Sequence, residues 1–247
     1  MSIKHKEGER MNRSVARCTV YNILSLCYTY PDEKVCSWIM EGKWIGEVEE
    51  SLGLLTEGNL QKDLDPFKEF LSGKSEEISL DLAREYTRLF ISGFPHVVAP
   101  PYGSIYLEKE GLVFGKTTSE VLRFYHEAGF TLKEDLKDLP DHIAHELEFM
   151  GILTGQEAQT SGTEKVKLEE VQMNFLSCFI LPWVPLLCDK IVEHSRSPFY
   201  RKLGNLTREF ISLEKNYLGI PEETNSSKKL NPMQEEVGHG EAIRNGN

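Results

Sequence analysis

The sequence lacks the paired cysteine motifs that hold small secreted domains or structural zinc sites together. No CxxC occurs, no cysteine–histidine framework with short spacing is present, and the cysteine count is odd: Cys18, Cys27, Cys36, Cys178 and Cys188. These absences exclude a disulfide scaffold and a zinc-finger module. We expect reduced, mostly buried thiols and a cytoplasmic protein.

Positive charge is also scarce, and the start of the chain has no apolar segment. Lys and Arg number 28 against 39 Asp and Glu, which gives a formal net charge of -11. A nucleic-acid-binding protein usually has the opposite balance, so we expect no nucleic acid partner. The first residues, "MSIKHKEGERMNRS", lack the hydrophobic region of a secretory signal, so we expect no leader here.

One uncharged run of eighteen residues, Val171 to Cys188, has the length of a membrane span. It contains Pro182 and Pro185, however, and proline breaks a helix where hydrocarbon tolerates broken helices poorly. We therefore expect two buried helical segments that meet at Pro182, and no integral membrane segment.

Alternating strand patterns and internal repeats are missing, and the apolar periodicity is helical almost throughout. The sequence predicts an all-α fold in one domain over residues 10–220. Helices are expected over 10–92 and 116–220, and residues 93–115 form a long ordered loop rich in Pro, Gly and Tyr. Thr117, with Glu120 three residues later, predicts a capping box. Residues 221–247 are polar and aperiodic, which predicts a disordered tail.

The segment "LPDHIAHELEFM" (139–150) is rich in potential metal ligands. A zinc protease motif would need HExxH, but the second histidine is absent. The nearest set is His142, His145 and Glu146, and a metal-dependent enzyme using it is an alternative. Without a metal, the segment would simply be a helix, in which the helix dipole stabilises the negative charge of Asp141 near the N-terminal end.

Nucleotide and nucleophile motifs are likewise incomplete. "GLVFGKTT" (111–118) has one residue too few between its glycines for a phosphate-binding loop, and GxGxxG and GxSxG do not occur. The sequence thus predicts neither an enzyme nor a cofactor, and a nucleotide-regulated switch at Gly111–Thr118 is a further alternative.

Three segments, taken together, indicate a family. "EYTRLFISG" (85–93), "PPYGSIY" (100–106) and "LPDHIAHELEFM" occur in this order, and "FYRKLGNLTREFI" (199–211) is a weaker addition. The chain resembles the TorD/DmsD/NarJ family of cytoplasmic redox-enzyme maturation chaperones, closest to its archaeal or NarJ-like branch. The family's E-P-x-D-H signature falls on Asp138 to His142, with Leu139 in place of proline. Gly103 stands where the family often has glutamate.

The resemblance implies an all-helical chaperone without enzymatic activity. Its client would be the catalytic subunit of a molybdopterin-containing oxidoreductase, or that subunit's twin-arginine signal peptide, held until the cofactor is inserted. A helical adaptor without signal-peptide binding is an alternative function. The oligomeric state expected is a monomer or a homodimer. Carboxylates beside an apolar groove would suit such a peptide. We therefore expect the binding residues to be Asp138, Asp141, His142, Tyr102, Tyr106 and Phe94.

Overall fold

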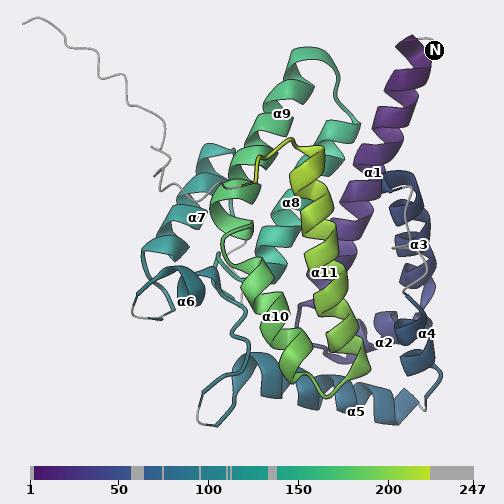
Figure 1. Ribbon diagram of the computed structural model, residues 1–247, viewed down its shortest axis with the longest axis vertical. Coiled ribbons are helices and arrows are strands. Elements are labelled where there is room, and N and C mark those ends of the chain that lie inside the picture. The colour runs from purple at the N-terminus through teal and green to yellow at the C-terminus, as the bar shows by residue number, and fades with distance from the viewer. Residues whose placement is uncertain are drawn as a thin grey trace, which may run out of the picture.

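The computed structural model of the chain describes residues 3–222 except 57–63, 74, 95, 110, 112 and 133–137 (Figure 1). Side chains are described from residue 12 onward, apart from the same gaps and 75–76. The predicted disordered tail, residues 221–247, lies outside the described residues apart from its first two positions. The described part contains helices and no strand, which confirms the all-α prediction.

The helices follow one another with short connections over most of the chain. In order they are α1 (Ile3–Cys27), α2 (Glu33–Glu41), α3 (Lys43–Leu55), α4 (Asp65–Leu71), α5 (Ser75–Tyr86), the π-helical turn η2 (Thr87–Ile91), α6 (Gly103–Leu107), α7 (Lys116–Glu127), α8 (Ile143–Ala158), α9 (Gly162–Phe175), the π-helical turn η3 (Leu176–Ile180), α10 (Val184–His194) and α11 (Pro198–Tyr217).

Local sequence sets several of these boundaries. Pro31 follows the end of α1, and Asp32 caps α2 by accepting a hydrogen bond from the Val35 amide at 2.9 Å. Gly42 ends α2 with a φ of 68°, a left-handed conformation that glycine adopts without steric cost. A proline, a capping carboxylate and a glycine therefore mark these helix ends.

The core is centred on α1, which packs along α8 and α3, while α10 packs on α11 (Figure 1). Val20 and Leu24 on α1 and Leu147 and Met150 on α8 are fully buried. α5 lies across one end of these longer helices (Figure 1). Because α1 contacts both the early and the late helices, residues from both halves of the chain share a single core.

The long uncharged run forms two helical segments, as expected. α9 continues into η3, the chain turns near Pro182, and α10 begins at Val184. Among the described residues, no single helix has the length and hydrophobicity to cross a membrane; only the pair Gly162–Ile180 and Val184–His194, bent by 52°, meets both criteria together. Trp183 and Leu187 in this region are fully buried.

The central loop differs from the prediction in two respects. It contains the five-residue helix α6, and the predicted capping box at Thr117 is wrong. α7 begins at Lys116 with Gly115 as its N-cap residue, and the Thr117 amide donates to the Glu108 carboxylate at 2.7 Å. Glu108 therefore performs, from nine residues upstream, the capping that the sequence assigned to a local side chain.

Candidate functional site

The Pro-Tyr loop is fastened to the segment that begins α8. Tyr102 and His142 form an isolated antiparallel bridge. Its hydrogen bonds run from the Gly103 amide to the Asp141 carbonyl and from the Ile143 amide to the Pro101 carbonyl, both at 2.9 Å. The two most specific motifs of the sequence, far apart along the chain, are thereby brought into direct contact.

Asp141 strengthens this attachment with its side chain. Its carboxylate is fully buried, and its Oδ2 accepts a hydrogen bond from the Ser104 amide at 2.8 Å, near the start of α6. A carboxylate that accepts a backbone N–H forms a charge-assisted bond. Asp141 lies before the α8 N-cap rather than in the first turn of the helix, so the expected dipole contribution is replaced by this long-range bond.

His142 is the N-cap residue of α8. Its Nδ1 accepts a hydrogen bond from the Ala144 amide at 3.1 Å, so Nδ1 is unprotonated. Burial lowers the pKa of His142 to about 4, against an opposing effect of Asp138 and a smaller one of His145 in the same direction as burial. The imidazole is therefore neutral at pH 7, and its ring lies edge-on to Tyr102 with centroids 5.1 Å apart.

Asp138 is the solvent-facing carboxylate of the motif. It is exposed, and Tyr102 donates its hydroxyl to Asp138 Oδ1 at 3.0 Å. Burial, and then the charge of Asp138, raises the pKa of Tyr102 well above its usual value, so the tyrosine remains a donor. The remaining lone pairs of this carboxylate face solvent and can accept hydrogen bonds from a cationic ligand.

Two further tyrosines lie beside this pair. Burial raises the pKa of Tyr86, with contributions from Asp138 and Tyr102, and Tyr30 packs edge-on against Tyr86 at 5.4 Å. Tyr30 is half exposed. We call Asp138, Tyr102, Tyr86 and Tyr30 the tyrosine–aspartate patch. Tyr30 was not predicted, because it follows α1 and no motif surrounds it.

A buried polar layer lies beneath the loop. Glu146 is fully buried, and its Oε2 accepts a hydrogen bond from Trp183 Nε1 at 3.2 Å. Burial, and secondarily Asp141, raises the pKa of Glu146 well above its usual range. Several buried atoms in this layer have no hydrogen-bond partner among the described residues: Asp141 Oδ1, Glu146 Oε1, His145 Nε2, Ser104 Oγ and Tyr106 Oη.

Gly103 belongs to this layer because of its close approach to Trp183. A Cβ at this position would lie 3.1 Å from Trp183 Nε1, closer than most real contacts allow. The glutamate that the resembling family often carries here could not fit without moving the indole. The close approach of Gly103 to Trp183 therefore favours glycine over glutamate at this position of the chain.

The metal and nucleotide alternatives find little support in this geometry. His142 Nδ1 caps α8 and Glu146 bonds to Trp183. The described part of the chain has no group of three or more His, Cys, Asp or Glu side chains placed to hold a metal ion. At Gly111–Thr118, the alternative nucleotide site, the Thr117 amide donates to the Glu108 carboxylate, and this bond holds the pKa of Glu108 below its usual value. A carboxylate in that position competes with phosphate.

The six predicted binding residues differ in how far the structure exposes them. Asp138 and Tyr102 are accessible, whereas Asp141 and His142 lie behind them. Tyr106 is half-buried against Trp183, with ring centroids 5.3 Å apart. Phe94 is fully exposed. The six residues thus differ in exposure, and their role in binding a client stays a prediction.

A buried ionic cluster was missed entirely. Arg17, within the apolar face of α1, is fully buried. Its guanidinium donates to Glu214, Glu157 and Gln172, with distances between 2.6 and 3.0 Å. These residues tie α1 to α8, α9 and α11. An arginine three residues before Val20, in the middle of an apolar stripe, was the available sequence signal for such a cluster.

Comparisons with known proteins extend over the same region. A family model described as nitrate reductase delta subunit matches residues 56–189. "Chaperone protein TorD" of Photobacterium profundum is 32% identical over 144 residues, and its namesake in Vibrio atlanticus is 31% identical. Each alignment covers 58% of this chain and 66% of the relative, so the chain spans just under two thirds of these relatives.

A solved structure, described as a candidate redox enzyme maturation protein from Archaeoglobus fulgidus, resembles the fold with a TM-score of 0.53 and 26% sequence identity. The superposition covers 79% of this chain and 93% of that one. The family match spans α4 to the middle of α10, including the loop and the start of α8. The chain therefore belongs to the nitrate reductase delta subunit family, in agreement with the resemblance of its sequence motifs.

Proposed function

We propose that this chain is a cytoplasmic chaperone that binds the signal peptide or the apo form of a molybdopterin-containing oxidoreductase subunit and assists cofactor insertion before export. The observation that carries the proposal is the tyrosine–aspartate patch, an exposed carboxylate oriented by a tyrosine hydroxyl on a rigid loop. The names of the relatives, chaperones and a maturation protein, support the same class of function.

The patch has the chemistry to bind an arginine side chain. A guanidinium can donate to the free lone pairs of Asp138, and such charge-assisted bonds are worth about 1.5–3 kcal/mol. The half-exposed ring of Tyr30 adds a surface for a cation–π contact, worth about 0.5–1 kcal/mol at exposed sites. The net charge of -11 favours encounter with a basic segment.

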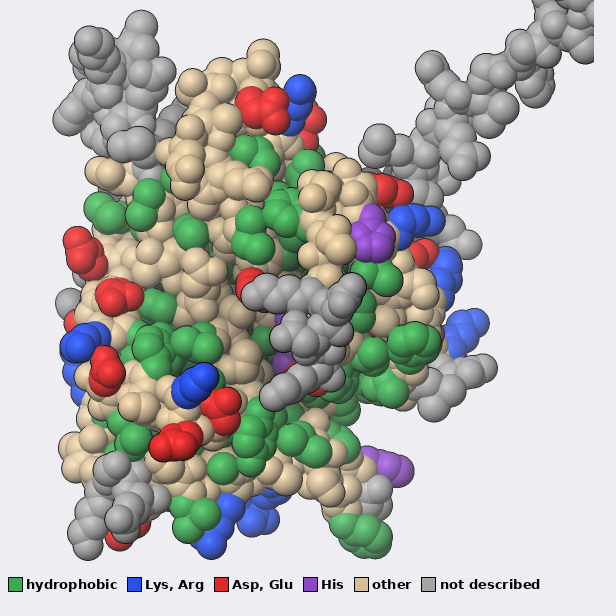
Figure 2. Space-filling view, turned by 180° about the vertical axis from the view of Figure 1, so that it is seen from behind, with side chains coloured by type: hydrophobic (Ala, Val, Ile, Leu, Met, Phe, Trp, Pro, Cys, Tyr) green, Lys and Arg blue, Asp and Glu red, His purple; other side chains and the backbone are tan. Residues whose placement is uncertain are grey.

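Apolar surface is available along the same part of the chain. Among the described residues from η2 to the start of α7, the exposed large hydrophobic side chains are Ile91, Phe94, Leu107, Val113 and Phe114. Hydrophobic side chains also group across the centre and lower part of the face drawn in Figure 2. A peptide with arginines followed by an apolar run could therefore place its charges on Asp138 and its apolar residues on this surface.

Asp141 and His142 take a different role in this proposal. Both are buried, so we assign them to positioning: Asp141 fastens the loop, and His142 caps α8 beside Tyr102. The expected direct contact of Asp141 with a client arginine is not available in this arrangement. Asp138 and Tyr102 remain the contact residues.

The test is a titration of a labelled peptide that contains two adjacent arginines and an apolar run. Asp138→Asn removes the charge at an exposed position, so binding should weaken roughly ten-fold or more while the melting temperature stays unchanged. Glu193→Gln, an equally conservative change at an exposed position on α10, is the matched control. Equal affinities of the two variants for the peptide would contradict arginine binding at the patch. In a separate experiment, failure of a client subunit to copurify with the wild-type chain would favour an adaptor role.

A further inference from the structure

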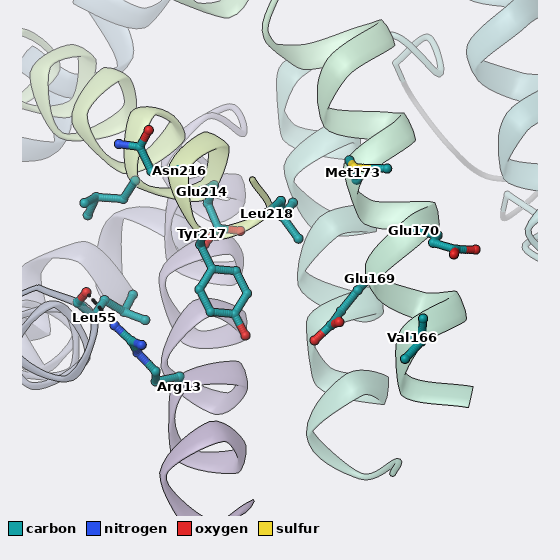
Figure 3. Close-up of a pocket in the computed structure, with 11 residues that line it drawn as sticks. Arg13, Leu55, Val166, Glu169, Glu170, Met173, Glu214, Asn216, Tyr217 and Leu218 are labelled. Atoms are coloured by element: carbon teal, nitrogen blue, oxygen red, sulfur yellow. Dashed lines mark hydrogen bonds between the residues drawn. The ribbon is translucent and has the colours of Figure 1, made fainter. Parts of the chain in front are cut away.

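A second surface lies at the other end of α1. A cleft of about 680 Å³ opens between α1, α9 and α11 and the end of α3 (Figure 3). Its volume falls within the range of pockets that bind small molecules. Arg13 lines this cleft near the start of α1, whereas Cys27 ends α1 on the side of the tyrosine–aspartate patch. The rise of about 1.5 Å per residue separates these two residues by roughly 20 Å.

The walls of the cleft combine apolar and charged side chains in similar proportion, and the apolar ones come mainly from α9 and α11. Val166 and Met173 are seven residues apart and lie on one face of α9, and Leu213 and Leu218 face them from α11. Val166 is 52% exposed. Apolar residues spaced over two turns of a helix are the usual lining of a groove that receives another helix.

A cation–π contact and a buried ion pair hold the floor of the cleft. Tyr217 stacks on Arg17, whose guanidinium carbon lies 4.2 Å from the ring centroid. Arg17 in turn holds Glu214 through three hydrogen bonds. A floor fixed by a buried ion pair loses little conformational freedom on binding, and that loss is one of the main costs of association.

Two of the three charged side chains that remain accessible in the lining, Glu169 and Glu170 against Arg13, are negative. Lys165 lies 4.0 Å from Glu169 and offsets part of its charge. Glu169 points from α9 toward Tyr217, and Glu170 lies on the outer side of the same helix (Figure 3). The carboxylate of Glu214 is neutralised by Arg17. Arg13 donates to the Leu55 carbonyl at 3.4 Å, at the edge of the cleft. A second copy of the chain would bring another net charge of -11, so a basic partner fits better.

We propose that this cleft is a docking groove for an amphipathic helix of a partner protein, whose apolar face fills the cleft and whose lysines or arginines pair with Glu169 and Glu170. The groove is separate from the tyrosine–aspartate patch and does not depend on the function proposed for it. A partner that reached both surfaces would gain affinity from the second contact, because that contact would then be intramolecular.

The test uses a labelled helical peptide with leucines at positions i, i+3, i+4 and i+7 and flanking lysines, titrated by fluorescence anisotropy against the full chain. Glu169→Lys and Val166→Asp should each weaken binding roughly ten-fold or more. The matched controls are Glu193→Lys, for an exposed acid, and Leu186→Asp, for an apolar side chain 50% exposed on α10. Both controls, and Asp138→Asn, should bind as the wild type does.

Four results would overturn the proposed groove. The first is an equal loss of binding in the cleft variants and in their controls. The second is equal binding of a peptide in which glutamates replace the lysines. The third is a loss that follows Asp138→Asn instead, which would place the peptide on the tyrosine–aspartate patch. Self-association of the chain that Val166→Asp abolished would identify a second copy as the occupant and would equally contradict the proposal.

Discussion

The Asp141 carboxylate and the Ser104 backbone amide are joined by a 2.8 Å hydrogen bond, and both residues are fully buried. This bond connects α6 to the residue before the α8 N-cap. Together with the bridge between Tyr102 and His142, it holds the loop in one position. The aspartate of the family signature thus determines where the tyrosine hydroxyl lies, and thereby how Asp138 is oriented.

We predict that Asp141→Ala lowers the free energy of unfolding by about 1.5–3 kcal/mol, because the Ser104 amide loses a charged acceptor in a buried position. Asp141→Asn should cost less, since its amide oxygen can still accept that bond. Urea denaturation at pH 7 measures both. Asp138→Asn is the control, and its stability should match the wild type; an unchanged midpoint for Asp141→Ala would mean that the bond is not needed to hold the loop.

His142 should make stability depend on pH on the acid side. Its pKa is lowered to about 4 in the folded state against 6.5 ordinarily, so only the unfolded chain gains a proton between these values. The contribution of neutral His142 to the free energy of unfolding is complete above pH 6.5. It is lost as pH falls toward 4, by at most about 1.4 kcal/mol per pH unit. His142→Asn keeps a capping acceptor and cannot titrate. Melting curves between pH 4 and 7 should therefore be flatter for this variant, and parallel curves would refute the assignment.

Glu146 should act in the opposite direction. Burial raises its folded-state pKa above the ordinary 4.5, so the folded chain binds more protons than the unfolded chain above that pH. Its contribution is complete below pH 4.5 and is lost as pH rises. Glu146→Gln keeps an oxygen for Trp183 Nε1 and removes the titration. The variant should be more stable than the wild type at pH 8 and nearly equal at pH 4.5; a constant difference across this range would argue against a buried, protonated Glu146.

Much of the fold could be predicted, because its boundaries depend on local chemistry. Asp32 caps α2 through its own neighbouring amides, and the prolines near Pro182 separate η3 from α10. α6 was missed because five residues carry too little periodicity to indicate a helix. The N-terminus of α7 was assigned wrongly because its capping carboxylate, Glu108, comes from outside the local window.

The site could be predicted only as a set of motifs. The Pro-Tyr and Asp-His segments were both recognised, but a spacing of 37 residues between Ser104 and Asp141 gives no sign that they bond. The sequence also could not show which carboxylate reaches solvent, because Asp138 is exposed and Asp141, three residues later, is buried. Tyr30 joins the patch only through the packing of α1 against the residues around Tyr86.

Arg17 gives the strongest stability prediction, because its charge is compensated only by other buried groups. Removing one partner of a buried ion pair costs about 3–5 kcal/mol, since the remaining charges stay desolvated. Arg17→Met should leave Glu157 and Glu214 without their cation and lower the free energy of unfolding by that amount. Lys165, whose ammonium lies 2.9 Å from Glu157, can compensate in part.

The double variant Arg17→Met with Glu214→Gln separates charge from packing. It removes the stranded carboxylate at Glu214, so it should recover part of the stability lost in Arg17→Met alone. Urea denaturation of both variants and the wild type measures the difference. If the double variant were less stable by the sum of two independent losses, the cluster would contribute through packing and not through charge compensation. The Tyr217 ring lies against the Arg17 guanidinium, and neither variant contains that guanidinium. The double variant should therefore recover stability without restoring this contact at the floor of the cleft.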